Sequence, residues 1–141
     1  MIDNNLKECR EDLGLTQTEL GYVLGVHYST VSGWEIGRDT MPLSKLVLFS
    51  NVYNLSLDYI TGLARGNKEY KEKIKLDKVK IGRNLKIIRK KLHLTQKQMS
   101  QMCGIAQNTY SNYENGIFLI NILAIYTLCK NQKISMDSII R

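Results

Sequence analysis

The sequence predicts an all-α protein that consists of two tandem five-helix domains joined by a basic linker. Three observations support this prediction: an internal repeat, apolar residues spaced three and four positions apart, and glycines at matching places in both copies. With a constant shift of 79 positions, residues 2–62 match residues 81–141 at 17 of 61 positions without a gap. The repeat therefore predicts a first domain at 1–62, a linker at 63–80 and a second domain at 81–141.

The first helix of each domain is predicted from one apolar face. Its apolar residues recur at three and four residue intervals, as expected for a helix that is buried on one side. They are Leu6, Cys9 and Leu13 in the first domain, and Leu85, Ile88 and Leu92 in the second. The helix should end at Gly14 or His93 in a left-handed conformation, because glycine adopts that conformation freely and histidine adopts it more often than most residues.

The second and third helices are predicted from capping residues and a glycine turn. A threonine is followed three residues later by Glu19 in "TQTE" and by Gln98 in "TQKQ", a pattern that caps a helix N-terminus. The second helix should run to Gly25 or Gly104, and the third should cover "HYSTVSGWE" or "AQNTYSNYE". Two short helices separated by a glycine turn form a helix-turn-helix.

The fourth and fifth helices complete each copy. The fourth passes through regularly spaced apolar residues, which are Leu46, Phe49 and Val52 in the first domain and Leu123, Tyr126 and Leu128 in the second. The fifth is short, "SLDYI" or "SMDSI", with Ser56 or Ser135 as its predicted N-cap.

These motifs resemble one known family. "GLTQTELGYVLGVHYSTVSGWEIG" and "HLTQKQMSQMCGIAQNTYSNYENG", each completed by a Ser-x-Asp-x-Ile helix, are similar to the Xre and lambda-repressor-like family of helix-turn-helix transcription factors. The resemblance covers everything except the linker. It implies that double-stranded DNA is the partner and that the third helix enters the major groove, where residues near its start and on its outward face contact base edges.

The resemblance also implies which residues contact DNA. They are Gln17, Tyr28, Ser29, Ser32, Gly33 and Arg38 in the first domain, and Gln96, Gln107, Asn108, Ser111, Asn112 and Asn115 in the second. The glutamine that begins each second helix matches the family's phosphate-contacting glutamine. The amides of Gln107 and Asn108 can donate to and accept from adenine together. The first domain offers fewer groups that could recognise bases.

Several residues that could suggest other chemistry have structural interpretations. The resemblance implies that Arg10 with Glu35, and Arg89 with Glu114, are ion pairs that join the first helix to the third. The aromatic residues at the inner end of the third helix, Trp34 and Tyr113, are expected in the core. So are the thiols of Cys9 and Cys103, as inert buried groups.

Enzymatic and metal chemistry are not expected from the sequence. No nucleophile lies beside a base, no glycine-rich loop cradles phosphate, and no ligand spacing accompanies His27 or His93. We therefore expect no catalytic residue, no metal and no cofactor. The longest apolar run, at 117–129, is too short to span a membrane, and three widely spaced cysteines favour the reducing cytoplasm.

Charge is divided unevenly along the chain, although its formal net charge is +7. Residues 1–62 contain 4 Lys or Arg against 8 Asp or Glu, the linker contains 7 against 3, and residues 81–141 contain 9 against 2. Attraction to phosphate supplies most non-specific DNA affinity. The linker and second domain should therefore provide most of the electrostatic binding. The linker could be extended or helical, and both forms remain open.

Two functional interpretations remain open. In the first, both domains bind DNA and one chain contacts two half-sites, with repression as the commonest outcome in the family. In the second, one domain is an interaction module for dimerisation or for an antitoxin-like partner, and only the other binds DNA. The loop after the third helix motivates the second interpretation, because the first domain keeps Arg38 there, whereas the second has Ile117, Phe118, Leu119 and Ile120.

Overall fold

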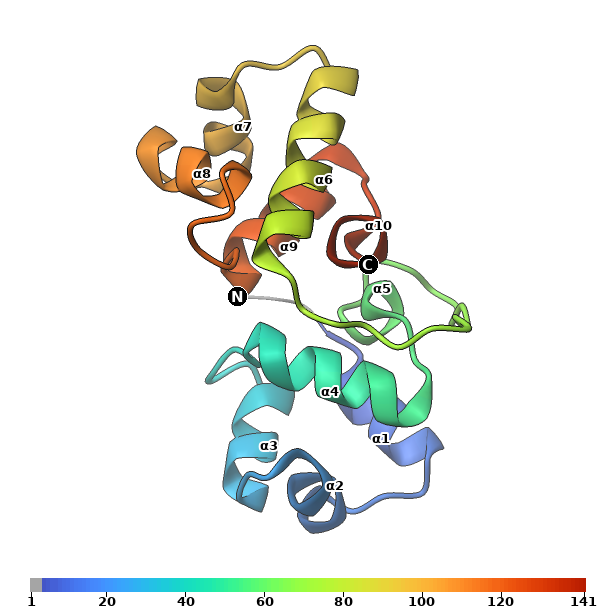
Figure 1. Ribbon diagram of the computed structural model, residues 1–141. Coiled ribbons are helices and arrows are strands. Elements are labelled where there is room, and N and C mark those ends of the chain that lie inside the picture. The colour runs from blue at the N-terminus through green and yellow to red at the C-terminus, as the bar shows by residue number, and fades with distance from the viewer. Residues whose placement is uncertain (1–3) are drawn as a thin grey trace. The chain divides into compact units, whose positions relative to one another are not determined.

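The computed structural model describes residues 4–141, which form ten α-helices and no strand (Figure 1). The chain divides into two compact units, Met1–Lys73 and Ile74–Arg141. These units are called the first and second domains from here on. The predicted all-α fold with two tandem helix-turn-helix domains is confirmed. Within the described range, every helix is too short or too polar to cross a membrane.

The first domain surrounds one apolar core. Its helices are α1 (Leu6–Asp12), α2 (Gln17–Leu24), α3 (Tyr28–Glu35), α4 (Leu43–Tyr53) and α5 (Leu57–Ile60). Each helix contributes a core side chain that is at most 1% exposed, namely Leu6, Leu20, Val31, Phe49 and Ile60. The predicted burial of Leu13 is wrong, because this residue is 37% exposed. It is the C-cap of α1, where the chain turns into Gly14 at φ +72°.

The second domain repeats this plan with a longer first helix. Its helices are α6 (Lys78–Lys91), α7 (Gln96–Cys103), α8 (Gln107–Glu114), α9 (Ile122–Gln132) and α10 (Met136–Ile140). Helix α6 has 14 residues, whereas α1 has 7. Gly82 lets α6 cross close to the end of α8, since a Cβ atom there would lie 2.5 Å from the carbonyl oxygens of Tyr113 and Glu114. The start of α6 is thereby fixed against the third helix of this domain.

The local signals that predicted the helices are confirmed. Thr16 and Thr95 each accept a hydrogen bond from the backbone N–H three residues on and complete a capping box. Ser56 and Ser135 cap α5 and α10 in the same manner. His93 has φ +57°, the left-handed conformation expected where the first domain has glycine. Helices α2 and α3 meet at a helix-turn-helix in the first domain, as α7 and α8 do in the second, with Gly25 and Gly104 as left-handed C-caps at φ +71°.

The segment assigned to the linker, residues 63–80, is helical only at Lys78–Lys80. Part of it is bound to the first domain. The Asn67 side chain donates to the carbonyl oxygen of Asn54 and accepts from the backbone N–H of Ser56 at 2.7 Å. The Tyr70 backbone N–H donates to the side chain of Asn54 at 3.2 Å. These hydrogen bonds hold residues 67–70 against the end of α4.

Candidate nucleic-acid interface

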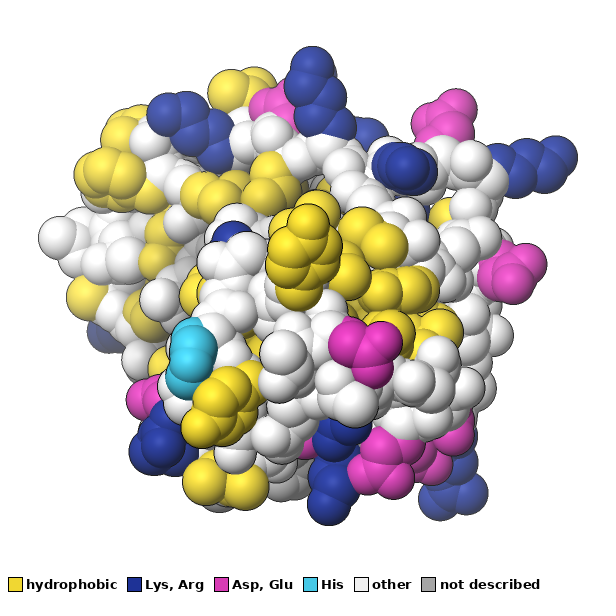
Figure 2. All heavy atoms as spheres, turned by 90° about the horizontal axis from the view of Figure 1, so that it is seen from below, with side chains coloured by type: hydrophobic (Ala, Val, Ile, Leu, Met, Phe, Trp, Pro, Cys, Tyr) yellow, Lys and Arg dark blue, Asp and Glu magenta, His cyan; other side chains and the backbone are white. Residues whose placement is uncertain are grey.

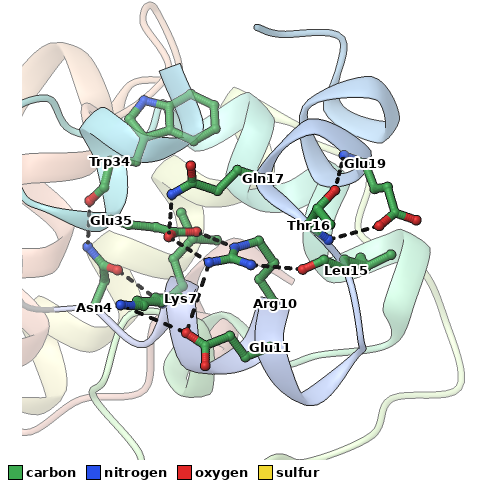
Figure 3. Close-up of polar contacts among 11 residues, drawn as sticks. Asn4, Lys7, Arg10, Glu11, Leu15, Thr16, Gln17, Glu19, Trp34 and Glu35 are labelled. Atoms are coloured by element: carbon green, nitrogen blue, oxygen red, sulfur yellow. Dashed lines mark hydrogen bonds and ion pairs between the residues drawn. The ribbon is translucent and has the colours of Figure 1, made fainter. Parts of the chain in front are cut away.

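The third helix of the first domain is fixed by a buried ion pair (Figure 3). Arg10 on α1 donates from Nε to Oε2 of Glu35 at 2.7 Å and from Nη2 to Oε1 at 3.0 Å. Its Nη1 donates to the Leu15 carbonyl oxygen at 2.8 Å, so the same guanidinium also holds the α1–α2 turn. Gln17 completes the group by donating from Nε2 to Oε1 of Glu35 at 3.1 Å. The predicted pairing of Arg10 with Glu35 is confirmed.

The second domain contains the same arrangement. Arg89 donates from Nε to Oε2 of Glu114 at 2.6 Å, and Gln96 donates to Oε1 at 3.3 Å. Burial raises the pKa of Glu114, but Arg89, with Tyr110 and Gln96 close by, outweighs burial and holds this pKa below its usual value. The hydrogen bonds to Glu114 raise the pKa of Arg89. The pair is therefore ionised at neutral pH, and α8 is tied to both α6 and α7.

The structure shows where the two predicted phosphate-contacting glutamines lie. Gln17 and Gln96 are the first residues of α2 and α7, as expected, and both are half-buried. The amide nitrogen of Gln17 points to Glu35 (Figure 3), and that of Gln96 donates to Glu114. The sequence does not predict this contact. Each glutamine therefore links the start of the second helix to the third helix before any ligand is bound.

The outward face of α8 presents an amide-rich surface. The side chains of Gln107, Asn108 and Asn115 are exposed, and those of Ser111 and Asn112 are half-buried. Asn108 accepts from the Thr109 backbone N–H at 3.0 Å, and Asn115 donates to Ser111 Oγ at 3.4 Å. Among the described residues, the amides of Gln107 and Asn112 have no hydrogen-bond partner. Four of the five predicted residues thus lie on α8 and Asn115 is its C-cap, with the amide groups of Gln107 and Asn112 open to a ligand.

The corresponding face of α3 has fewer amide groups. His27 caps the helix by accepting from the Ser29 N–H at 3.2 Å, and its ring lies 4.4 Å from that of Tyr28. Tyr28 and Ser29 are exposed, and Ser32 is half-buried. Figure 2 views the first domain from the side on which α2 and α3 lie in Figure 1. In this view hydrophobic and uncharged polar side chains occupy much of the middle, and basic side chains lie mostly toward the edge.

The loop after α3 returns Arg38 to the helix. Its guanidinium donates from Nη2 to the Ser29 carbonyl oxygen at 3.1 Å and from Nε to Oδ2 of Asp39 at 3.1 Å. A Cβ atom at Gly33 would clash with Arg38 Nη2 and approach Asp39 Oδ2 to 2.8 Å. Arg38 and Asp39 are more than half exposed. Their side chains therefore cover the α3 surface at Gly33, an arrangement that the sequence analysis missed.

The equivalent loop of the second domain is apolar and exposed. Ile117 is 50% exposed and Phe118 56%, whereas Ile120 is buried in the core. The loop backbone is held by α6, because Lys78 donates to the Ile117 carbonyl oxygen at 3.3 Å and Val79 lies against Gly116. The side chains of Ile117 and Phe118 thus project from a fixed backbone.

The residues assigned to the core are buried as predicted. Trp34 and Tyr113 at the inner ends of α3 and α8 are 4% and 8% exposed. Cys9 and Cys103 are buried thiols. Burial raises the pKa of Cys103 to about 12 and, with the nearby carboxylates of α1, raises that of Cys9 to about 12. These thiols are protonated at neutral pH and cannot act as nucleophiles in the folded state.

A protein-family model described as helix-turn-helix (HTH_3) matches the chain twice, over residues 6–60 and 85–138. The first match contains all five helices of the first domain, and the second contains α7 to α9 with parts of α6 and α10. The two matches together cover most of the chain. They coincide with the repeat described above.

Individual relatives point to the same group of proteins. The chain is 35% identical over 63 residues to the uncharacterized HTH-type transcriptional regulator YobD of Bacillus subtilis (strain 168), which is 45% of this chain and 56% of that protein. It is 34% identical over 75 residues to the uncharacterized HTH-type transcriptional regulator YqaE of the same organism, 53% of this chain and 65% of that protein.

A third relative has a different name. The chain is 35% identical over 60 residues to the antitoxin PezA of Streptococcus pneumoniae serotype 4 (strain ATCC BAA-334 / TIGR4), 43% of this chain and 38% of that protein. The chain therefore spans between 38% and 65% of the length of these three relatives.

Proposed function

Because the chain belongs to the helix-turn-helix family, whose members among its relatives are HTH-type transcriptional regulators, we propose that it is a sequence-specific regulator that binds double-stranded DNA. Helices α3 and α8 enter the major groove, and repression is the expected outcome. The proposed regulator acts in the cytoplasm, in agreement with its three free cysteines.

One observation carries this proposal: each domain presents polar groups on a third helix that is tied to its first and second helices by a buried Arg–Glu–Gln group. A fixed helix with exposed amides suits base recognition, because glutamine and asparagine can form paired hydrogen bonds with adenine. The amides of Gln107, Asn108 and Asn112 meet this requirement best.

Phosphate contacts position the protein in this proposal. The N-termini of α2 and α7 offer backbone N–H groups beside Gln17 and Gln96, and Lys97 adds a positive charge on α7. Such contacts orient the helices on the duplex and carry no sequence information themselves. Ser111 on α8, Asn115 at its C-cap, and Tyr28, Ser29 and Ser32 on α3 are proposed to lie at the base edges.

The test is selection of bound sequences from random duplex DNA with the purified chain, followed by footprinting on the selected site. A reproducible preferred sequence is expected. Two protected half-sites per chain, about 34 Å apart, would show that both domains bind. Binding without any sequence preference would contradict the proposal.

A second candidate function rests on the exposed Ile117 and Phe118 and on the similarity to an antitoxin. In it, the second domain's apolar loop contacts another copy of the chain or a protein partner, and only one domain binds DNA. One half-site per chain, together with concentration-dependent self-association, would favour this candidate over the first.

A further inference from the structure

We propose that Arg38 recognises a guanine base and that Gly33 and Asp39 hold its guanidinium on the outward face of α3. The inference rests on the proposed function. It adds a base-recognising group that comes from the loop after α3 and not from the helix itself. A basic residue in this loop would ordinarily be expected to contact phosphate. The position of the Arg38 guanidinium over Gly33, on the face of α3, favours a base contact instead.

The Arg38 guanidinium lies against the face of α3 that contains Ser29 and Gly33. Ser29 and Gly33 are four residues apart and share one face of α3, the face on which base contacts are proposed. Arg38 comes from the loop beyond the helix, yet its Nη2 atom reaches the Ser29 carbonyl oxygen at 3.1 Å. It does so by lying across Gly33, where any Cβ atom would clash with it. The guanidinium therefore occupies the place of a side chain at residue 33.

Contacts within the described residues use only two of the N–H donors of Arg38, which leaves the others for a ligand. An arginine has five N–H donors. The Nε donor is used by Asp39 and one Nη2 donor by Ser29. Among the described residues, Nη1 has no acceptor. Both Nη1 donors and one Nη2 donor therefore remain for a ligand, and together they can form a two-donor fork. Guanine O6 and N7 accept such a fork, the commonest specific arginine contact in the major groove.

Asp39 also contacts the Arg38 guanidinium. Its carboxylate pairs with Nε, on the side of the guanidinium away from the two-donor fork. An acidic group near DNA is unfavourable for affinity because it repels phosphate. Its presence is explained if Asp39 is a positioning residue that fixes the plane of Arg38. The backbone N–H of Asp39 also donates to the Gly33 carbonyl oxygen at 3.2 Å, so the loop itself is bound to the helix.

The second domain lacks the residues that form this arrangement. Asn112 stands where the first domain has Gly33, and Ile117 and Phe118 stand where it has Arg38 and Asp39. A side chain at residue 112 already occupies the helix face, and the two loop positions that carry Arg38 and Asp39 in the first domain are apolar here. The two domains should therefore recognise different bases. We expect a guanine that depends on Arg38 in one half-site and adenines that depend on α8 in the other.

The experiment compares variants of the intact chain on the selected duplex and on duplexes with each guanine replaced. Arg38→Ala and Arg38→Lys should each lose about 5- to 150-fold of discrimination at one guanine, which corresponds to one bidentate contact. Arg38→Lys keeps the positive charge but loses the planar fork, so its salt dependence should stay unchanged. Arg65→Ala is the control, since it removes an exposed arginine elsewhere in the first domain.

Two further variants separate the positioning of the Arg38 guanidinium by Gly33 and Asp39 from the effect of net charge. Gly33→Ala should fold, because only the flexible ends of Arg38 and Asp39 must move and alanine favours a helix. It should reduce the guanine preference without changing the net charge. Asp39→Ala should also reduce the preference, while it raises affinity for all duplexes by removing a negative charge. Circular dichroism and thermal unfolding would verify that each variant is folded.

The outcomes distinguish this inference from the function on which it rests. If the unmodified chain selects no sequence, the proposed function fails and the inference with it. If the chain selects a sequence but Arg38→Ala weakens all duplexes equally and lowers the salt slope by about one, Arg38 contacts phosphate and only the inference is overturned. Unchanged guanine preference in Gly33→Ala would show that Gly33 does not position Arg38 for the base contact.

Discussion

Arg10 Nε lies 2.7 Å from Glu35 Oε2, and both side chains are buried, with the carboxylate 2% exposed. The contact joins residues 25 positions apart, and the second domain repeats it with the same sequence separation between Arg89 and Glu114. In each domain it fixes the third helix to the first. The helix that we propose for base recognition is therefore held in place before DNA is bound.

The first prediction is that Glu35→Ala destabilises the protein by roughly 3–5 kcal/mol, since it leaves the buried Arg10 guanidinium without its partner. Glu8→Ala is the control. Glu8 is an exposed carboxylate on the same helix as Arg10, and such a surface substitution should change the stability by less than about 0.5 kcal/mol. Chemical denaturation followed by circular dichroism would measure both. Equal effects would show that the buried pair has no special role.

The second prediction concerns pH. The pKa of Glu114 is held below its unfolded value. A carboxyl group with a lowered folded pKa contributes stability above its unfolded pKa, about 4.3, and this contribution is lost as pH falls through the folded pKa. The unfolding free energy of the chain should therefore decline below about pH 4.5. The decline should be smaller in Glu114→Gln. Parallel pH profiles for the two proteins would contradict the assignment.

The sequence was sufficient to predict the helices and the N-caps at Thr16, Thr95, Ser56 and Ser135, because these depend on local patterns, and the family resemblance implied the two ion pairs. Thr16 and Thr95 illustrate the local case. The contact of Gln17 with Glu35 was not predictable, since an amide at a helix start can face solvent or the interior with the same pattern. The position of the Arg38 guanidinium over Gly33 was also not predictable from the sequence. A glycine inside a helix is a signal of close approach, but the sequence does not say what approaches.

The third prediction is that Gln107 and Asn108 determine base specificity in the second domain. Gln107→Ala and Asn108→Ala should each remove roughly 1–3 kcal/mol of discrimination at one or two adjacent positions of the selected site. Competition binding with single-base variants of that site would measure the effect. An unaltered preferred sequence in both variants would mean that these amides do not contact bases.

Gln96→Ala is the matched control for this prediction. Gln96 lies at the start of α7 and is expected to contact phosphate, so its replacement should weaken binding to all sequences about equally. Because Gln96 also donates to Glu114, the variant's stability must be measured beside its affinity. A sequence-dependent loss in Gln96→Ala would place this residue among the base-contacting groups.

The fourth prediction is that the exposed pair Ile117 and Phe118 forms a contact with another copy of the chain or with a protein partner. Replacing both with serine should lower self-association, because adjacent exposed apolar side chains on a fixed loop favour burial against a partner surface. Analytical ultracentrifugation over a range of concentrations would measure this. The control is Val52→Ser, which removes an exposed apolar side chain from α4 of the first domain. Equal sedimentation of all three proteins would refute the contact.

The last prediction concerns the division of labour between the domains. Residues 74–141 contain 12 Lys or Arg against 3 Asp or Glu, whereas residues 1–73 contain 8 against 10. A fragment of residues 74–141 should therefore bind duplex DNA alone, with affinity that falls steeply as salt rises, by a slope of about 0.9 for each phosphate contacted. The fragment 1–73 should bind weakly, because its net charge is negative.

Comparing the intact chain with fragment 74–141 on the same selected site would then show what the first domain adds. If α3 binds a second half-site, removal of the first domain should shorten the footprint and lower the affinity. If the first domain is an interaction module, the footprint per chain should persist while self-association is lost. Net charge does not locate individual charges, and Arg38 remains available on α3 for a base contact. Tighter binding by fragment 1–73 would therefore show that this one positioned arginine outweighs the charge surplus of the second domain.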